Sequence, residues 1–159
     1  MKKFVNPPPF YFAYGSNMNP ERMKERGAHY ESYTRAVLRN YRLTFNKRCY
    51  TYKGYGCANL EPSEGDFVEG VLYLLKNPRE AIRKLDYYEG YPEHYNRLIL
   101  EVETDRGTYP AVVYLAQPWM VDSSLKPHPE YLAHLLEACK LKILSEDYCK
   151  KIKAAFGGN

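Results

Sequence analysis

The chain has 159 residues, of which 45% are hydrophobic and 26% are charged, and 17 of them are tyrosines. This length predicts one domain, residues 1–159, that is large enough to bury a core. The formal net charge is only +4, with acids and bases interspersed, so charge by itself does not indicate nucleic acid as a partner.

The cysteines and histidines show none of the common metal-site spacings. Cys49, Cys57, Cys139 and Cys149 form no Cys-x-x-Cys pair, and we expect thiols in a reducing compartment. The four histidines form no His-x-x-x-His pair, so no metal site is expected. Nucleotide-binding motifs are missing from the sequence, and we expect no cofactor. No apolar run is long enough for a membrane span or resembles a signal peptide, so a cytoplasmic protein is expected.

The chain is predicted to begin with a surface lead-in, a strand and a short helix. Residues 1–9 end in three prolines, which cannot join a sheet ladder or a helix interior. Residues 10–14 are rich in aromatic β-formers and predict a strand. Asn19 is a suitable N-cap, Pro20 a suitable first helical residue, and Gly27 a suitable stop.

Gly15-Ser16-Asn17 is then a tight turn between this strand and the helix. Such a turn points backbone N–H groups outward and can bind an anion or an oxyanion. Gly15 has no Cβ that would obstruct a ligand or forbid a positive φ. The alternative is an ordinary turn that uses Gly and Asn for backbone reasons alone.

The next stretch is predicted to contain strands around a basic loop. Residues 29–46 alternate and carry many β-formers, which predicts one or two strands. Residues 47–56 predict a basic, aromatic hairpin or loop, and bases could stack on its tyrosines while Lys47, Arg48 and Lys53 hold phosphates. We favour the alternative, a solvated loop with extended cationic side chains.

The centre of the chain predicts two more strands and a helix. Residues 58–60 form a short strand before a turn at 62–65, and residues 67–75 form a strand that enters the core. A helix is predicted to begin at Asn77-Pro78 and to stop near Gly90.

The last third predicts a hairpin, two helices and a frayed tail. The hairpin strands are 95–103 and 109–115, the helices run from Pro127 or Pro129 to about Lys140 and from the N-cap Ser145 onward, and the tail is 157–159. This element order predicts a mixed α/β fold, and the hairpins argue against a purely parallel sheet.

Glu89 is the residue on which the catalytic prediction rests. If residues 78–89 are helical, Ile82, Leu85 and Glu89 share one face, so an acid lies on an apolar stripe. The helix dipole at this C-terminal turn and the like charge of Asp86 both raise the pKa of Glu89. A raised pKa suits proton transfer at neutral pH. The alternative is a helix-end glutamate that points into solvent.

Two segments resemble the γ-glutamylcyclotransferase family and its AIG2-like relatives, over about residues 9–140. The first is similar to the family's opening motif and reads Tyr11-Phe12-Ala13-Tyr14-Gly15-Ser16-Asn17. The second is similar to the surroundings of the family's catalytic glutamate and reads Leu85-Asp86-Tyr87-Tyr88-Glu89-Gly90, followed by Tyr91 and Tyr95-Asn96-Arg97. The resemblance implies a small mixed β-barrel flanked by helices, with a pocket at one barrel mouth.

The resemblance also implies a reaction and its residues. A γ-glutamyl amine or amino acid would be cyclised to 5-oxoproline with release of the amine, in a cofactor-independent acyltransferase or lyase type of step. Glu89 would be the general acid and base. The substrate would be bound by Tyr11, Phe12, Ala13, Tyr14, Gly15, Ser16, Asn17 and Tyr131. For Tyr131 a packing role on an amphipathic helix is equally open.

Two other functions stay open. One is a non-catalytic small-molecule-binding or interaction module that keeps the same pocket. The other is nucleic-acid binding through residues 47–55, which would show a strong loss of binding with salt. The expected partner is a small γ-glutamyl substrate, with neither nucleic acid nor membrane. The leaving group and the oligomeric state are open, with a homodimer as one option.

Overall fold

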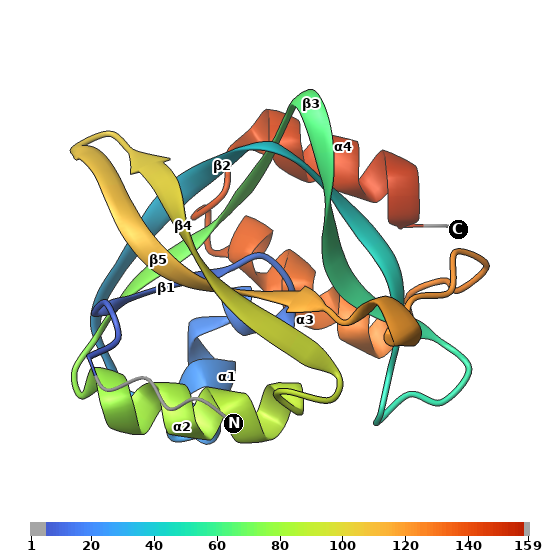
Figure 1. Cartoon of the computed structure of the whole chain (residues 1–159). Coiled ribbons are helices and arrows are strands. Elements are labelled where there is room, and N and C mark those ends of the chain that lie inside the picture. The colour runs from blue at the N-terminus through green and yellow to red at the C-terminus, as the bar shows by residue number, and fades with distance from the viewer. Residues whose placement is uncertain (1–5, 158–159) are drawn as a thin grey trace.

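Five strands close into a barrel with the order β1-β3-β2-β4-β5 around it (Figure 1). The computed structural model describes residues 6–157, so residues 1–5 of the predicted lead-in and 158–159 of the predicted tail lie outside the described residues. The strands are β1 (Phe10–Ala13), β2 (Tyr30–Arg48), β3 (Gly56–Leu75), β4 (Tyr95–Thr104) and β5 (Gly107–Ala116). The mixed α/β class and the small barrel are confirmed.

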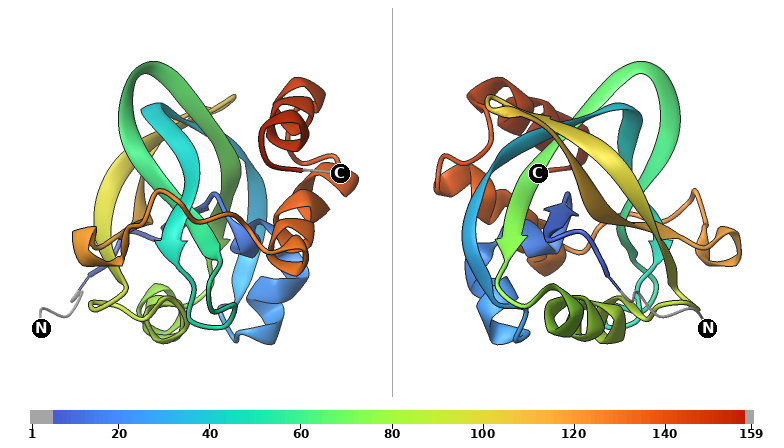
Figure 2. Two further views of the ribbon diagram at one scale, coloured as in Figure 1. Left: turned by 90° about the vertical axis from the view of Figure 1, so that its right-hand side faces the viewer. Right: turned by 60° about the vertical axis from the view of Figure 1, so that its left-hand side comes forward.

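Helices cover one end and one side of this barrel. They are α1 (Pro20–Glu25), α2 (Pro78–Glu89), α3 (Pro129–Lys140) and α4 (Glu146–Phe156), with short 3₁₀ turns η1 (Ser16–Met18) and η2 (Pro118–Met120). In both views of Figure 2, α1, α2 and the tip of the β2–β3 hairpin lie at the same end of the barrel. This end carries the candidate site.

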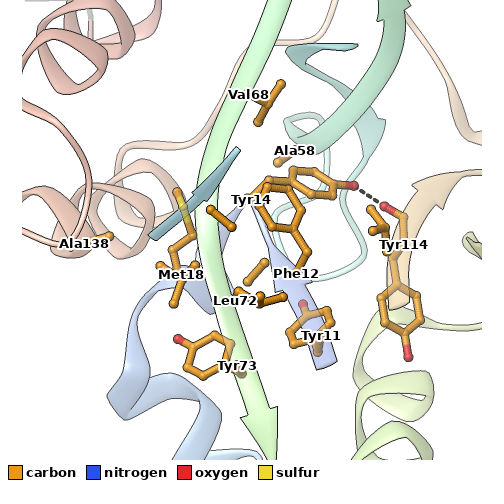
Figure 3. Packing of buried hydrophobic residues seen from close by; sticks show 14 of the residues in the cluster. Tyr11, Phe12, Tyr14, Met18, Ala58, Val68, Leu72, Tyr73, Tyr114 and Ala138 are labelled. Carbon is orange, nitrogen blue, oxygen red and sulfur yellow. Dashed lines mark hydrogen bonds between the residues drawn. The ribbon is translucent and has the colours of Figure 1, made fainter. Parts of the chain in front are cut away.

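The short strand β1 lies in the core, with side chains buried on both of its faces. It pairs antiparallel with β3, with Tyr11 opposite Tyr73, and parallel with β5, with Tyr11 opposite Val112. Phe12 is fully buried, and Figure 3 shows it among Leu72 and Tyr14. The aromatic strand predicted at residues 10–14 is confirmed and ends one residue earlier, at Ala13.

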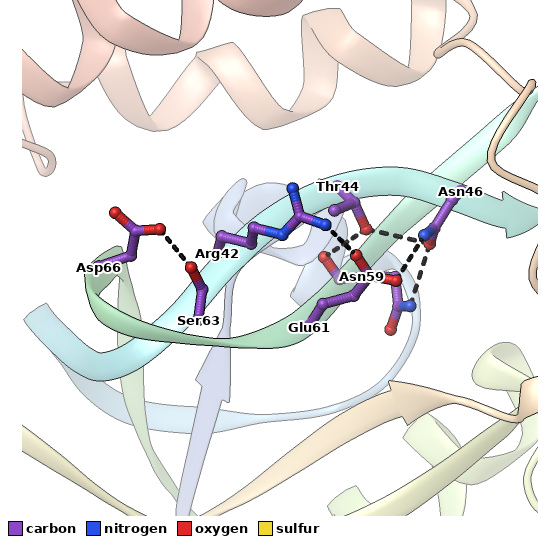
Figure 4. A network of polar contacts seen from close by, with 7 residues as sticks. All are labelled: Arg42, Thr44, Asn46, Asn59, Glu61, Ser63 and Asp66. Atoms are coloured by element: carbon purple, nitrogen blue, oxygen red, sulfur yellow. Dashed lines mark hydrogen bonds and ion pairs between the residues drawn. The ribbon is translucent and has the colours of Figure 1, made fainter.

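One long hairpin, β2–β3, replaces the several short strands predicted between residues 29 and 75. The predicted turn at 62–65 is wrong, because β3 continues through it as an irregular bulge while β2 runs past on the other side. Gly65 has a φ of 86° and donates its N–H to Asn40 Oδ1 at 3.1 Å, which fixes the bulge. Figure 4 shows the polar side chains here, including the 2.7 Å ion pair between Arg42 and Glu61.

The predicted helix starts are largely confirmed by their capping contacts. Asn19 and Ser145 accept backbone N–H groups of their own helices, as expected of N-caps. At α3 it is His128 that caps the helix, which therefore begins at Pro129. Asn77 precedes α2 without a side-chain capping bond, while Gly90 ends α2 in the left-handed conformation at φ 70°.

The expectation of free thiols is wrong. Cys49 bonds to Cys57 across the tip of the β2–β3 hairpin, and Cys139 at the end of α3 bonds to Cys149 in α4. Pairing register and helix packing bring these residues together, and neither is visible in cysteine spacing alone. These two disulfides remove the basis for expecting a reducing compartment. No helix within residues 6–157 is long and apolar enough to cross a membrane.

Candidate active site

A cavity of about 480 Å³ opens at the barrel end near α1 and α2. Its wall combines the end of β1 with η1, one face of α1, the tip of the β2–β3 hairpin, the end of α2 and the start of β4. The sequence-predicted residues that line it are Tyr11, Tyr14, Gly15, Ser16, Asn17, Glu89 and Tyr131. Phe12 and Ala13 do not line it and lie in the core, so the structure assigns them to packing.

Asn17 connects the N-terminal turn to the carboxylate of Glu89. Its Nδ2 donates to Glu89 Oε1 at 3.2 Å and to Tyr11 Oη at 3.1 Å. Its Oδ1 accepts from Arg26 at 3.1 Å, and its backbone carbonyl accepts from Tyr73 Oη at 2.7 Å. These four contacts fix the amide and hold the Glu89 carboxylate against the turn.

Glu89 is part-buried and faces the cavity from the last turn of α2. Ile82 and Leu85 on the same face are buried, which confirms the predicted stripe. Burial raises the pKa of Glu89, while the positive charges of Arg26, Lys47 and Arg22 oppose this rise. The carboxylate therefore stays close to cations that favour its ionised form, which the sequence did not predict.

Asp86 raises the pKa of Glu89 less than expected, because its carboxylate has partners of its own. It is in an ion pair with the buried Arg97 and accepts from Tyr114 Oη at 2.7 Å. The charge of Asp86 raises the pKa of Glu89, but by less than burial raises it or than Arg26, Lys47 and Arg22 lower it. Asp86 thus ties α2 to the barrel strands β4 and β5.

Gly15 is required for close packing and not for its backbone angle. Its φ is −116°, so the expectation that a positive φ selects glycine here is wrong. A Cβ at this position would lie 2.9 Å from both Ala58 Cβ and Tyr131 Oη. The Tyr131 oxygen accepts the Ala58 N–H at 3.1 Å. Tyr131 is therefore both a packing residue and a wall of the cavity.

Other tyrosines place hydroxyl groups in the same wall. Tyr14 donates to the backbone carbonyl of Tyr114, as the dashed line in Figure 3 shows. Tyr95 donates to the carbonyl of Ala58 at 2.7 Å. Burial raises the pKa of Tyr14 and of Tyr95 well above the ordinary value, so both hydroxyls keep their protons at neutral pH.

Lys47 is the main site residue that the sequence analysis did not find. It was assigned to a solvated loop, which is wrong: it lies at the end of β2, is only 3% exposed and lines the cavity. Its Nζ is 2.9 Å from His94 Nδ1 and 4.9 Å from the centre of the Tyr95 ring. Alternation from the buried Phe45 could have indicated the burial, had the strand been predicted to continue to residue 48.

The remaining hairpin tip packs against the site. Tyr52 stacks on His128 with ring centroids 4.6 Å apart, and Tyr55 meets the same ring edge-on at 4.7 Å. Two of the tyrosines considered for base stacking thus already contact the His128 ring. Within residues 6–157, no three His, Cys, Asp or Glu side chains are placed to hold a metal ion.

Residues 11–137 match the model of the family described as "Gamma-glutamyl cyclotransferase, AIG2-like". The chain belongs to this family. Among curated relatives, the γ-glutamylcyclotransferases of Bos taurus and Homo sapiens are 29% identical over 149 residues and 28% identical over 150 residues. Each match covers 91% of this chain and 77% of the relative.

Solved structures share the fold of this chain. One described as a γ-glutamyl cyclotransferase has a TM-score of 0.77 and 30% identity, over 91% of this chain and 86% of that one. YkqA from Bacillus subtilis has a TM-score of 0.82 and 25% identity, over 96% of this chain and 55% of that one, so the chain spans about half the length of YkqA. The resemblance noted in the sequence is therefore confirmed at the level of family and fold.

Proposed function

We propose that this member of the family cyclises a γ-glutamyl amine or amino acid to 5-oxoproline, with Glu89 as the single general acid and base. The observation that carries the proposal is the 3.2 Å contact between Asn17 Nδ2 and Glu89 Oε1 inside the cavity. It joins the only carboxylate that the described residues contribute to the cavity wall to the turn that follows β1. The family membership and the γ-glutamylcyclotransferase names of the relatives support the same reaction.

The substrate supplies its own nucleophile in this reaction. Glu89 takes a proton from the α-ammonium group, and the freed amine attacks the γ-carbonyl carbon to close a five-membered ring. The bond to the leaving nitrogen then breaks as Glu89 returns the proton to that nitrogen. The ring nitrogen gives its second proton to Glu89, which passes it to the released amine, so the products are the neutral lactam and a protonated amine and Glu89 is ionised again. The α-ammonium group supplies every proton that is transferred and Glu89 carries each of them, so neither water nor a cofactor is needed. Because attack is intramolecular, holding the substrate in a folded conformation supplies much of the rate.

The cavity wall provides groups for the charges of the substrate. The oxyanion on the γ-carbonyl needs preorganised hydrogen-bond donors, which we assign to the turn at Gly15–Asn17 and to the Tyr131 hydroxyl. The α-carboxylate needs a cation, which we assign to Arg22 of α1 and to Arg26, which directly follows this helix. Arg22 Nε is buried and lacks a hydrogen-bond partner within the described part of the chain, which suits an anion-binding role.

The test is conversion of γ-glutamyl compounds by the wild-type protein and by Glu89→Gln. The substitution keeps shape and hydrogen bonding but removes proton transfer, which typically contributes ~10²–10⁴-fold in rate. We expect turnover to 5-oxoproline to fall by at least that factor. Ligand affinity should change far less, because Asn17 and the tyrosines remain.

Melting temperature and calorimetric affinity serve as controls for this pair. The melting temperature should hold or rise, since a carboxylate that burial disfavours is gone. Near-normal turnover by Glu89→Gln would exclude Glu89 as the acid and base. Binding by both proteins without turnover by either would instead support the non-catalytic binding module.

A further inference from the structure

The cavity carries more positive than negative charge. Among residues 6–157, three cations line it, Arg22, Arg26 and Lys47, against the single carboxylate of Glu89. Burial and the neighbouring Lys47 lower the pKa of His94, which keeps that ring neutral at pH 7. A γ-glutamyl group is itself a zwitterion, so a substrate with an uncharged leaving group would bring no net negative charge. The charge excess fits a substrate with one further anionic group.

Lys47 is the most deeply buried of these three cations. Within residues 6–157 it forms no ion pair, although only 3% of it is exposed. An ammonium group has three donors, and only His94 Nδ1 accepts one of them from Lys47 among the described residues. Burying an unpaired charge costs stability, so its place in the wall is not explained by folding.

The other two cations belong to a different wall of the cavity. Arg26 donates to Asn17 and lies over the Tyr88 ring, and Arg22 approaches His134 at 3.4 Å. Arg22 lies in α1 and Arg26 directly follows this helix, beside the turn assigned to the γ-glutamyl group. Lys47 stands at the end of β2 with His94 and Tyr95 from the start of β4. The two walls can therefore hold two separate anionic groups.

Resting on the function proposed above, we propose that Lys47 binds the carboxylate of the departing amino acid and thereby selects γ-glutamyl amino acids over γ-glutamyl amines. Lys47 lines the cavity, and the only acidic side chain that the described residues contribute to its wall is Glu89, whose Oε1 accepts from Asn17. His94, as a neutral acceptor, holds the ammonium in place without cancelling its charge. Lys47 is thus a specificity-determining residue, and the chemistry remains with Glu89.

A matched pair of substrates tests this assignment. γ-Glutamylalanine and γ-glutamylethylamine differ only by one carboxylate on the leaving group. We expect the wild-type protein to favour the alanine compound. In Lys47→Met, kcat/KM for that compound should fall about 10- to 100-fold, the effect of one charge-assisted hydrogen bond, and mainly through KM. The ratio of the two kcat/KM values should therefore shift at least tenfold.

Lys53→Met is the control, since Lys53 is exposed on the same hairpin tip and does not line the cavity. It should leave the ratio unchanged. An equal loss on both substrates in Lys47→Met would overturn the proposal, because Lys47 would then serve the γ-glutamyl group or the fold. No loss on either would overturn it as well.

Failure of the proposed function is distinguishable from failure of this inference. If the wild-type protein converts neither compound, cyclotransfer is excluded for this pair, and calorimetry with the same two compounds decides about Lys47. Tighter binding of the carboxylated compound that Lys47→Met abolishes would support the assignment. Equal binding of both compounds by the wild-type protein would overturn it.

Discussion

At the scale of single residues, the cavity holds two groups, Glu89 and Lys47, whose pKa values are shifted in opposite directions. Burial raises the pKa of Glu89 above its ordinary value and lowers the pKa of Lys47 to about 8. Burial therefore favours the neutral form of each group. The opposite charge of each group, in turn, favours the ionised form of the other. The protonation states that we assign to the reaction are an ionised Glu89 and a charged Lys47.

The pH dependence of kcat/KM should report both groups. Activity should fall on the acid side as Glu89 takes up its proton, at a pH above the ordinary range of a glutamate. With γ-glutamylalanine, kcat/KM should also fall above a pH of about 8, where Lys47 loses its charge. γ-Glutamylethylamine serves as the control, because both compounds share the α-ammonium group. A fall of the same size with both compounds would contradict the assignment of the alkaline limb to Lys47.

The same shift determines how Glu89 affects stability. A carboxyl whose folded-state pKa is raised binds its proton more tightly in the folded protein than in the unfolded chain. Its contribution is therefore most favourable at low pH and is lost as the pH rises through the folded-state pKa. Because this contribution of Glu89 to stability is lost at neutral pH, Glu89→Gln is expected to hold or raise the melting temperature there.

Gly15→Ala should disturb the site through packing. The added Cβ would meet Ala58 and the Tyr131 hydroxyl at 2.9 Å, while the φ of −116° is open to alanine. Overpacking of this kind costs about 1–3 kcal/mol. We expect weaker binding of a γ-glutamyl ligand in calorimetry and a lower urea midpoint.

Tyr131→Phe provides the matched second variant for this test. Removing the hydroxyl gives the new Cβ room on one side, so the double variant should recover part of the decrease in the urea midpoint caused by Gly15→Ala. Strictly additive losses in the double-mutant cycle would show that the two positions do not act through this contact.

At the scale of elements, β3 and α4 are joined by one buried carboxylate. Glu69, 7% exposed, accepts from the Ser145 backbone N–H at 2.8 Å and from the Ser145 hydroxyl at 2.6 Å. Ser145 in turn caps α4 through the Tyr148 N–H. The capping residue was predicted from sequence, but its partner on a distant strand was not.

Glu69→Ala should loosen α4 from the barrel. Two donors would lose their acceptor, which costs about 1–3 kcal/mol each when the groups stay buried. We expect a lower denaturant midpoint and faster amide exchange in residues 146–156. Glu146→Ala is the control, because its 3.6 Å pair with Lys150 is exposed and contributes less than about 1 kcal/mol. Equal exchange in the two variants would contradict the proposed link.

Features that depend on local chemistry could be predicted from the sequence, and features that depend on strand pairing register could not. The strand at 10–14, the stripe of α2 and the stop at Gly90 follow from side-chain type and spacing within a few residues. The burial of Lys47 and the Cys49–Cys57 bond instead depend on how β2 and β3 align across the hairpin. No local pattern contains that alignment.

At the scale of the whole molecule, the cavity draws on nearly the full length of the chain. Its charged and polar wall comes from α1, the end of β2, the end of α2, the start of β4 and the start of α3. The barrel holds these parts in register, and the ion pair of Asp86 with Arg97 fixes α2 against it. Affinity and fold stability are therefore coupled, and a ligand should raise the melting temperature.

The pairing of β1 also has a consequence for the order of folding. Its partners lie about 60 and 100 residues further along the chain, as the pairs Tyr11–Tyr73 and Tyr11–Val112 show. During synthesis from the N-terminus, this aromatic strand emerges early and stays unpaired until β3 and β5 have followed. Such long loops must close before the contacts between the strands are made, which slows folding. A chain that stopped before β5 would contain the segment 11–17 and Glu89, yet it would lack the strand that closes the barrel around them.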